Sequence, residues 1–170
     1  MSILLLAILI GLLSIIIYQD FKSREISWFL IPLLFIVGIA NALYNINLFE
    51  FTSYVGINLS IIILNLLGVT LFVSLKEKKL KNIIDSYLGL GDVLFFLVLT
   101  TIFSPFNFIL FFIGSILITS IVYVAIILLN KQKQTLIPLA GAMSLLLVIA
   151  LVVQFIYPSF NFYQDLFIFE

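Results

Sequence analysis

Six long stretches of mostly apolar residues make up most of this chain, and short polar loops separate them. The hydrocarbon core of a bilayer is about 30 Å thick, and a helix needs about 20 mostly apolar residues to cross it. The six stretches cover approximately residues 2–19, 28–46, 51–75, 87–103, 106–129 and 136–157. The sequence therefore predicts an all-α, polytopic membrane protein with six transmembrane helices, which form one domain over residues 1–157.

The composition agrees with a lipid environment and excludes several kinds of chemistry. Hydrophobic residues make up 64% of the 170 residues and charged residues 9%, whereas soluble domains contain about 45–50% apolar and about 25% charged residues. The chain has no cysteine and no histidine, so disulfides, thiolate metal sites, cysteine nucleophiles and histidine-based sites are excluded. The formal net charge is zero, which argues against a nucleic-acid partner. No metal or other cofactor is predicted.

The two ends of the chain need separate interpretation. The first apolar stretch lacks a positively charged start and a small-residue cleavage site, so it is predicted to be a retained helix rather than a signal peptide. Residues 158–170 are aromatic but also contain Asn161, Gln164, Asp165 and Glu170. We therefore expect an extracytoplasmic, interfacial tail there rather than a seventh span.

The eight basic residues predict the orientation in the membrane. All of them lie in the loops that follow the first, third and fifth apolar stretches, namely Lys22, Arg24, Lys76, Lys78, Lys79, Lys81, Lys131 and Lys133. With six spans these loops share one side, and the positive-inside rule makes that side cytoplasmic. The sequence thus predicts a multi-pass protein of the cytoplasmic (inner) cell membrane with both termini outside the cytoplasm.

Two aspartates occupy unusual positions in this arrangement. Asp20 closes the first apolar stretch, and Asp92 lies a few residues inside the fourth. At 1.5 Å per residue, Asp92 is roughly 8 Å below the predicted cytoplasmic interface, at a depth similar to that of Asp20. An ionisable group in a span is costly and usually marks a working site. The alternatives are a solvated helix end for Asp20 and a structural hydrogen bond for Asp92, and the shared depth favours function.

The residues before Asp92 strengthen this hypothesis. Asp92 ends the run Gly-Leu-Gly-Asp, in which Gly89 and Gly91 carry no side chain. Glycines allow another backbone or a ligand to approach closely, and an extended substrate that must reach a carboxylate at the membrane rim needs such an opening. Small residues also serve plain helix packing, so G-x-G alone is a weak signal. Its combination with two aspartates at matching depth is more specific.

Two carboxylates at one depth predict a defined kind of acid–base chemistry. If they lie close together they share a proton, because both cannot ionise easily. The ionised member can take a proton from a water that attacks a peptide carbonyl, and the protonated member can polarise that carbonyl. Neither a covalent intermediate nor a metal is required. The sequence does not assign the proton to Asp20 or to Asp92.

These residues resemble the type IV prepilin peptidase family, which includes the archaeal preflagellin peptidases and consists of membrane aspartyl proteases with a six-helix catalytic core. Residues 20–28, D-F-K-S-R-E-I-S-W, are similar to the family pattern D-x-(K/R)-x-R-x-I-P-N around its first catalytic aspartate. The run at 89–92 matches its G-x-G-D motif, and residues 137–141 resemble its late I-P-(F/L)-(A/G)-(G/P) segment. The resemblance implies that Asp20 and Asp92 are catalytic and that Gly89, Gly91 and Pro138 belong to the motifs that admit the substrate.

Three departures from the family pattern stand out. Ser27 occupies the usual proline position, so the turn into the second helix is less restrained. Leu94 stands where the family often has lysine, two residues after the motif aspartate. Bifunctional members carry a cytoplasmic insertion with paired C-x-x-C motifs, which is linked to methylation of the trimmed pilin, whereas this chain has a short loop and no cysteine. The resemblance therefore implies a peptidase without the methyltransferase activity.

The resemblance also implies the substrate class and the partners. Precursors of type IV pilins have a short basic leader, a glycine or alanine before the cut, and then a long apolar helix. We expect cleavage at the cytoplasmic membrane face, with the apolar helix against the bundle inside the membrane lipid. Acidic contacts to the leader from Glu25, Glu77 or Asp85 are a further, weaker expectation.

The sequence leaves three alternatives for the function. A related G-x-G-D intramembrane protease would have more helices and an aspartate deep in a helix, unlike Asp20. A small transporter or channel subunit would use Asp92 as a proton or cation site, although such sites usually lie at the midplane. A catalytically inactive homologue is the third alternative.

Small residues of the last two stretches are expected to be close-packing positions: Gly114, Ser115, Thr119, Ser120, Gly141, Ala142 and Ser144.

Overall fold

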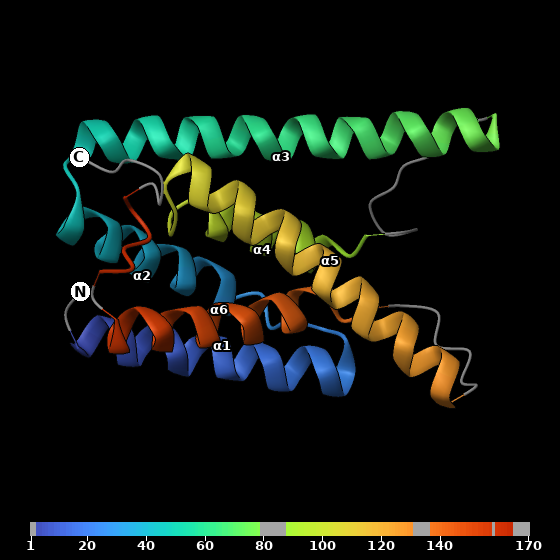
Figure 1. The fold of residues 1–170 in the computed structure, drawn as a ribbon, viewed down its shortest axis with the longest axis horizontal. Helices are drawn as coiled ribbons and strands as arrows, with labels where there is room; N and C mark the ends of the chain where they lie inside the picture. The colour runs from blue at the N-terminus through green and yellow to red at the C-terminus, as the bar shows by residue number, and fades with distance from the viewer. Residues whose placement is uncertain (1–2, 79–87, 131–136, 158, 165–170) are drawn as a thin grey trace.

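The computed structural model describes residues 3–78, 88–130, 137–157 and 159–164. Within these ranges the chain is all-α (Figure 1). Its helices are α1 (Ile3–Ser23), α2 (Leu30–Asn45), α3 (Leu48–Glu77), α4 (Leu90–Leu99), α5 (Pro105–Asn130) and α6 (Leu139–Ile156). Each lies within or close to one of the predicted apolar stretches, so the all-α class and the order of six helices are confirmed for this part of the chain.

The helices differ in their ability to cross a bilayer. In the described part of the chain, four helices (α1, α3, α5 and α6) are long and apolar enough to span a membrane. Large apolar side chains are exposed along α3 and α5, as expected where lipid is the solvent, and the protein is a membrane protein. The helices α2 and α4, with 16 and 10 residues, are shorter. That they also span the bilayer stays a prediction.

Helix α4 is shorter than expected because the chain tightens after Leu99. The N–H groups of Thr100, Thr101 and Ile102 bond to carbonyls three residues back, at 3.3, 3.0 and 3.1 Å. Such bonds are typical of a closing 3₁₀ turn. The two threonine hydroxyls also donate to the carbonyls three residues earlier, at 2.7 and 2.8 Å. Helix α5 then begins with Pro105, whose missing N–H is no loss at a first helical position.

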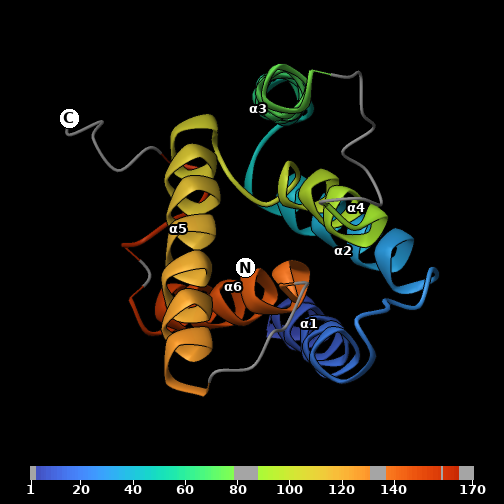
Figure 2. The ribbon, with the colours of Figure 1, turned by 90° about the vertical axis from the view of Figure 1, so that its right-hand side faces the viewer.

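The helices run alternately in opposite directions through the bundle. Figures 1 and 2 show α1 and α6 side by side, and this pair has the most extensive contact between helices. Helix α2 packs against both α1 and α4, and α5 crosses over α6. The centre of the core is apolar, and its members include Leu9, Leu13, Ile16, Leu34, Phe95, Met143 and Leu147. The core thus lies between α1, α2, α4 and α6.

Helix α3 lies at the edge of the bundle (Figure 2). Only Asn58 and Ile62 are buried along its described length. The side-chain amide of Asn58 donates to the main-chain carbonyls of Thr100 and Phe103, at 3.2 and 2.9 Å. The side chain of Asn58 therefore ties α3 to the turn after α4.

The ends of α1, α3 and α5 lie together at one end of the bundle (Figure 1). Lys22, Arg24, Lys76 and Lys78 are found there, whereas the other four basic residues (Lys79, Lys81, Lys131 and Lys133) lie outside the described residues. This is the arrangement that the loop pattern predicted. That this end faces the cytoplasm, with both termini on the opposite side, stays a prediction.

The described part of the C-terminal segment packs into the bundle, which the sequence did not indicate. Phe162 and Tyr163 are buried. The side-chain amide of Asn107 contacts the carbonyls of three residues in this segment, Asn161, Phe162 and Gln164, at 3.3, 3.1 and 2.8 Å. The Tyr163 hydroxyl bonds to the Asn41 amide at 3.2 Å and donates to the Thr101 carbonyl at 3.4 Å. Residues 159–164 therefore close one end of the core.

Candidate active site

Asp20 lies in the last turn of α1 and points into the bundle. Its side chain is 6% exposed, and its Oδ2 accepts a hydrogen bond from the Gly141 N–H at 2.5 Å. The helix ends directly afterwards, because Arg24 adopts a left-handed conformation with φ of 57° and its N–H bonds to the Asp20 carbonyl at 3.0 Å. The Arg24 guanidinium also interacts electrostatically with the Asp20 carboxylate. Asp20 is therefore not a solvated helix end.

Asp92 lies in the first turn of α4 and is half-buried. Its Oδ1 accepts a hydrogen bond from the Ala140 N–H at 2.8 Å. Its Oδ2 accepts one from the N–H of Gly89 at 3.2 Å. Gly89 is the N-cap of α4 in an extended conformation, so the second bond is one half of a capping box, in which an acidic residue of the first turn satisfies the amide before the helix.

The first turn of α6 joins the two aspartates. Ala140 and Gly141 are consecutive residues, and consecutive Cα atoms are about 3.8 Å apart, so the carboxylates from α1 and α4 meet at neighbouring amides. These amides are among the helix-start N–H groups that have no partner within the helix, and the N-terminus of a helix favours negative charge. The two carboxylates also interact electrostatically with each other. The structure thus brings together the two aspartates that the sequence singled out.

Both aspartates line one cleft of about 280 Å³. Its other walls are the loop from α1 to α2, the first turn of α2 and the start of α4, which contribute Arg24, Glu25, Ile26, Trp28, Ile31, Gly89, Leu90, Gly91 and Leu94. The loop is held by the Gln19 side chain, whose Oε1 accepts a hydrogen bond from the Ser27 N–H at 2.8 Å. A proline at this position has no N–H to donate. The Gln19 bond therefore restrains the turn that the missing proline was expected to loosen.

The three glycines of the site have different neighbours. A Cβ at Gly141 would lie 2.9 Å from Asp20 Oδ2 and 3.2 Å from the Phe21 ring. A Cβ at Gly89 would lie 3.1 Å from Asp92 Oδ2, and one at Gly91 would lie 3.4 Å from the Ile26 side chain. Gly141 is thus the most tightly enclosed, as predicted for a close-packing position. That Gly89 and Gly91 admit a substrate stays a prediction.

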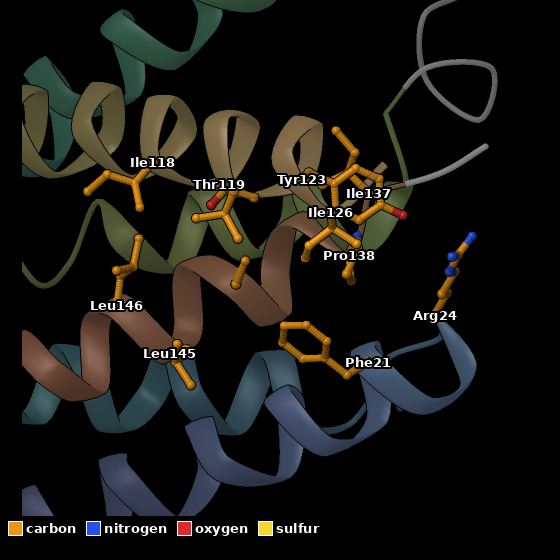
Figure 3. A pocket seen from close by; sticks show the side chains of 12 residues that line it. Phe21, Arg24, Ile118, Thr119, Tyr123, Ile126, Ile137, Pro138, Leu145 and Leu146 are labelled. Carbon is orange, nitrogen blue, oxygen red and sulfur yellow. The ribbon is translucent and has the colours of Figure 1, made fainter. Parts of the chain in front are cut away.

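Pro138 is the N-cap of α6, immediately before the turn that holds the aspartates. It lines a second cavity, of about 360 Å³, beside the cleft of the aspartates. Figure 3 shows this cavity between α5 on one side and α6 with the end of α1 on the other. Pro138 is therefore next to the site but faces an adjoining, more apolar space.

Some members of the site were not predicted as such. The amides of Ala140 and Gly141 bind the aspartates, but a backbone N–H has no signature in a sequence. Arg24 was interpreted as an orientation signal and as part of the family pattern after Asp20, but it was not assigned to the site. Its guanidinium interacts electrostatically with Asp20, and the residue lines the cleft. Leu94 was noted only as a departure from the family, and it lines the cleft. Among the described residues, no group of three or more acidic residues is arranged to hold a metal ion.

The comparison with protein families agrees with this geometry. Residues 7–126 match the model of the type IV leader peptidase family. The chain belongs to this family. It is therefore an aspartic-type leader peptidase of the membrane, a class that acts on prepilin-like substrates, and this membership decides against a transporter or channel subunit. Searches of curated proteins and of solved structures gave no match. The matched residues include both aspartates but not α6, so the contact with the α6 amides is an observation independent of the match.

Proposed function

We propose that this leader peptidase removes the short basic leader of type IV prepilin-like precursors at the cytoplasmic membrane face, with Asp20 and Asp92 as the catalytic pair. The supporting observation is that α1 and α4 present the two carboxylates to consecutive amides of α6 at one cleft. Paired carboxylates are sufficient for peptide hydrolysis by an activated water. The residues of the site therefore need no other catalytic group.

The reaction needs one ionised and one protonated carboxylate. The ionised one takes a proton from water while the water oxygen attacks the carbonyl carbon, and the protonated one gives its proton to the carbonyl oxygen. The tetrahedral intermediate collapses when the nitrogen of the cut bond receives a proton and the C–N bond breaks. The carboxylate that took the proton from water can supply it, while a hydroxyl of the intermediate returns a proton to the other carboxylate. Asp20 and Asp92 can each start in either role.

The α6 amides position the pair during these proton transfers. Each carboxylate has one oxygen bound to an amide, Asp20 Oδ2 to Gly141 and Asp92 Oδ1 to Ala140. These bonds limit rotation of the carboxyl groups, and a defined geometry of reacting groups contributes strongly to catalysis. Helix α6 thus sets the spacing of two residues that come from different helices.

The cleft suits an extended, basic leader. It contains three acidic side chains, those of Asp20, Glu25 and Asp92, with Arg24 as its basic residue. Of the other acidic contacts that were considered, Glu77 ends α3 and does not line this cleft. Asp85 lies outside the described residues. Glu25 is therefore the acidic residue outside the catalytic pair that we expect to contact the leader.

Two conservative substitutions test the catalytic pair. Asp20→Asn and Asp92→Asn keep the shape of the side chains but cannot take a proton from water, so each should abolish cleavage of a pilin-like precursor, measured as a mobility shift in membranes that contain both proteins. Glu50→Gln is the matched control, because Glu50 caps α3 by accepting from the Asn47 N–H at 3.4 Å and is not part of the cleft. Membrane insertion of all three variants should equal that of the unsubstituted protein. Cleavage that persists in either aspartate variant would refute the two-aspartate mechanism.

A further inference from the structure

A long apolar groove runs between α5 and α6. Its first part is the 360 Å³ cavity beside Pro138, and a second cavity of about 340 Å³ continues it along the same two helices. Ile118 and Leu146 line both parts. The groove follows α5 from Ile126 back to Leu110, which at 1.5 Å per residue is roughly 24 Å. It therefore extends through most of the thickness of a bilayer core.

One end of this groove meets the cleft of the aspartates. Phe21, which directly follows Asp20, lines the groove together with Arg24 (Figure 3). Arg24 lines the cleft as well. Ala142 lines the groove and directly follows Gly141, whose N–H binds Asp20. A chain that crosses the aspartates from the cleft therefore enters the groove within a few residues.

The groove contains a polar group that has no hydrogen-bond partner among the described residues. This group is the hydroxyl of Thr119 on α5, whose side chain is 6% exposed and lines the first part of the groove. Burial of a hydroxyl without a hydrogen bond is unfavourable. A helix start has four N–H groups without intrahelical partners, and a membrane interior offers no water to satisfy them. Thr119 can accept a hydrogen bond from such a group.

Small residues leave room in the second part of the groove. No atom of the described residues would lie within 4 Å of a Cβ built at Gly114, so the expectation that Gly114 is a close-packing position was wrong for this part of the chain. Its helical neighbour on the same face, Ile118, is 50% exposed. Open space at a glycine on an apolar surface permits another helix to approach closely.

We propose that this α5–α6 groove binds the apolar helix of the precursor directly after the cut bond, and that Thr119 accepts a hydrogen bond from the main chain of its first turn. The inference rests on the proposed function, since it names where that substrate lies. The basic leader occupies the acidic cleft on one side of Asp20 and Asp92, and the apolar helix occupies the groove on the other. The basic part of the substrate thus meets the acidic cleft, and its apolar part meets the apolar groove.

Disulfide capture tests the position of the helix, and the absence of cysteine from the chain makes single-cysteine variants unambiguous. Ile118→Cys is compared with Val124→Cys, which lies on the same helix, is similarly exposed at 56%, and does not line the groove. The probe is a pilin-like precursor with one cysteine in the second turn after the cut. We expect capture by Ile118→Cys at least about tenfold above that by Val124→Cys. Equal capture at both positions would assign the groove to lipid chains and overturn the proposal.

Kinetics on the same precursor test the contribution of the groove to binding. Ile118→Trp fills the groove and removes apolar burial of the bound helix, so KM should rise at least about tenfold with kcat changed by less than about twofold. Val124→Trp should leave both constants within about twofold of the unsubstituted values. An unchanged KM in Ile118→Trp would refute the groove as the binding site.

A conservative pair tests Thr119 separately. Thr119→Val removes only the hydroxyl, and the loss of one hydrogen bond to the substrate should raise KM about threefold to tenfold, whereas Thr119→Ser should restore it. A purely structural hydroxyl without a partner would leave KM unchanged in Thr119→Val, and that result would overturn its assignment. If the unsubstituted protein fails to cleave the precursor, the proposed function fails. If it cleaves normally while Ile118 and Val124 variants behave alike, only the groove is refuted.

Discussion

Substitution of Gly141 by alanine perturbs the candidate active site with the smallest possible change. Gly141 lies in the first turn of α6, and its N–H holds Asp20 Oδ2 at 2.5 Å. A Cβ at this position would lie 2.9 Å from that oxygen, 3.0 Å from the Asp20 Cβ and 3.2 Å from the Phe21 ring. Ordinary van der Waals contacts begin at 3.4 Å. The Asp20 side chain or α6 must therefore move by about half an ångström.

The magnitude of the effect follows from this displacement. A misplacement of about 1 Å in a catalytic constellation can reduce the rate about 100-fold, so half of that distance predicts a decrease in kcat of about tenfold to 100-fold. Helix propensity acts in the opposite direction, since alanine is favoured over glycine by about 1 kcal/mol in a helix. The variant should therefore remain folded while its kcat falls.

The assay is cleavage of a pilin-like precursor by purified protein in detergent, with KM and kcat determined separately. Gly11→Ala is the matched control, because Gly11 lies on α1 like Asp20 but a Cβ there has no atom of the described part of the chain within 4 Å. It should retain the kcat of the unsubstituted protein. Thermal unfolding of both variants reports whether the fold is kept.

A normal kcat in Gly141→Ala would contradict the reasoning, because it would show that Asp20 does not need its place against α6. Loss of activity together with a large fall in unfolding temperature would point to a folding defect instead. Gly141→Ser places a larger side chain at the same point. If this variant folds, its kcat separates a displaced Asp20 from a folding defect. A folded variant with low kcat and unchanged KM is the expected result.

The remaining predictions concern the opposite end of the core. Asn107→Ala removes an amide that contacts three carbonyls of the C-terminal segment. In denaturant titrations it should lower the free energy of unfolding by about 1–3 kcal/mol. The control Asn65→Ala, at an exposed position, should leave the free energy of unfolding unchanged. Burial raises the pKa of the Tyr163 hydroxyl, so the unfolded chain loses this proton at a lower pH than the folded protein. Stability should therefore fall as the pH rises above about 10. In thermal unfolding, the unfolding temperature of Tyr163→Phe should decrease less over this pH range. A Cβ at Gly38 would collide with the Thr101 hydroxyl, so Gly38→Ala should destabilise the protein by about 1–3 kcal/mol. Adding Thr101→Ala should recover part of that loss, and strictly additive effects in the double-mutant cycle would contradict the contact.

Hydrophobic length and loop charge predicted the helices but not all of their ends. The apolar stretches lie at the positions of α1 to α6, because a helix in lipid must satisfy its backbone internally and so follows the apolar run. The exceptions have local causes. Helix α4 ends at Leu99 because threonine hydroxyls and tight turns compete with the helix there. Helix α3 starts earlier than expected because Asn47 and Glu50 form a capping box.

The two aspartates could be selected from the sequence because a charge in an apolar stretch is rare and costly. Asp20 and Asp92 were predicted to lie at one depth, and the structure shows them at adjacent amides. Their roles stay proposals. The basic residue Arg24 beside them was not assigned to the site, since positive charges at helix ends have an ordinary explanation as topology signals.

The sequence by itself determined that the protein lies in a membrane, the order of its helices and which two carboxylates stand out. It could do so because hydropathy, charge and the cost of burying a charge are properties of single residues. Only the tertiary structure decided what joins them. The amides of Ala140 and Gly141, the burial of residues 159–164 and the groove that contains Thr119 all depend on contacts between segments far apart in the chain. Backbone donors look the same at every position of a sequence, so only the packing of α1, α4 and α6 shows which of them hold the paired aspartates.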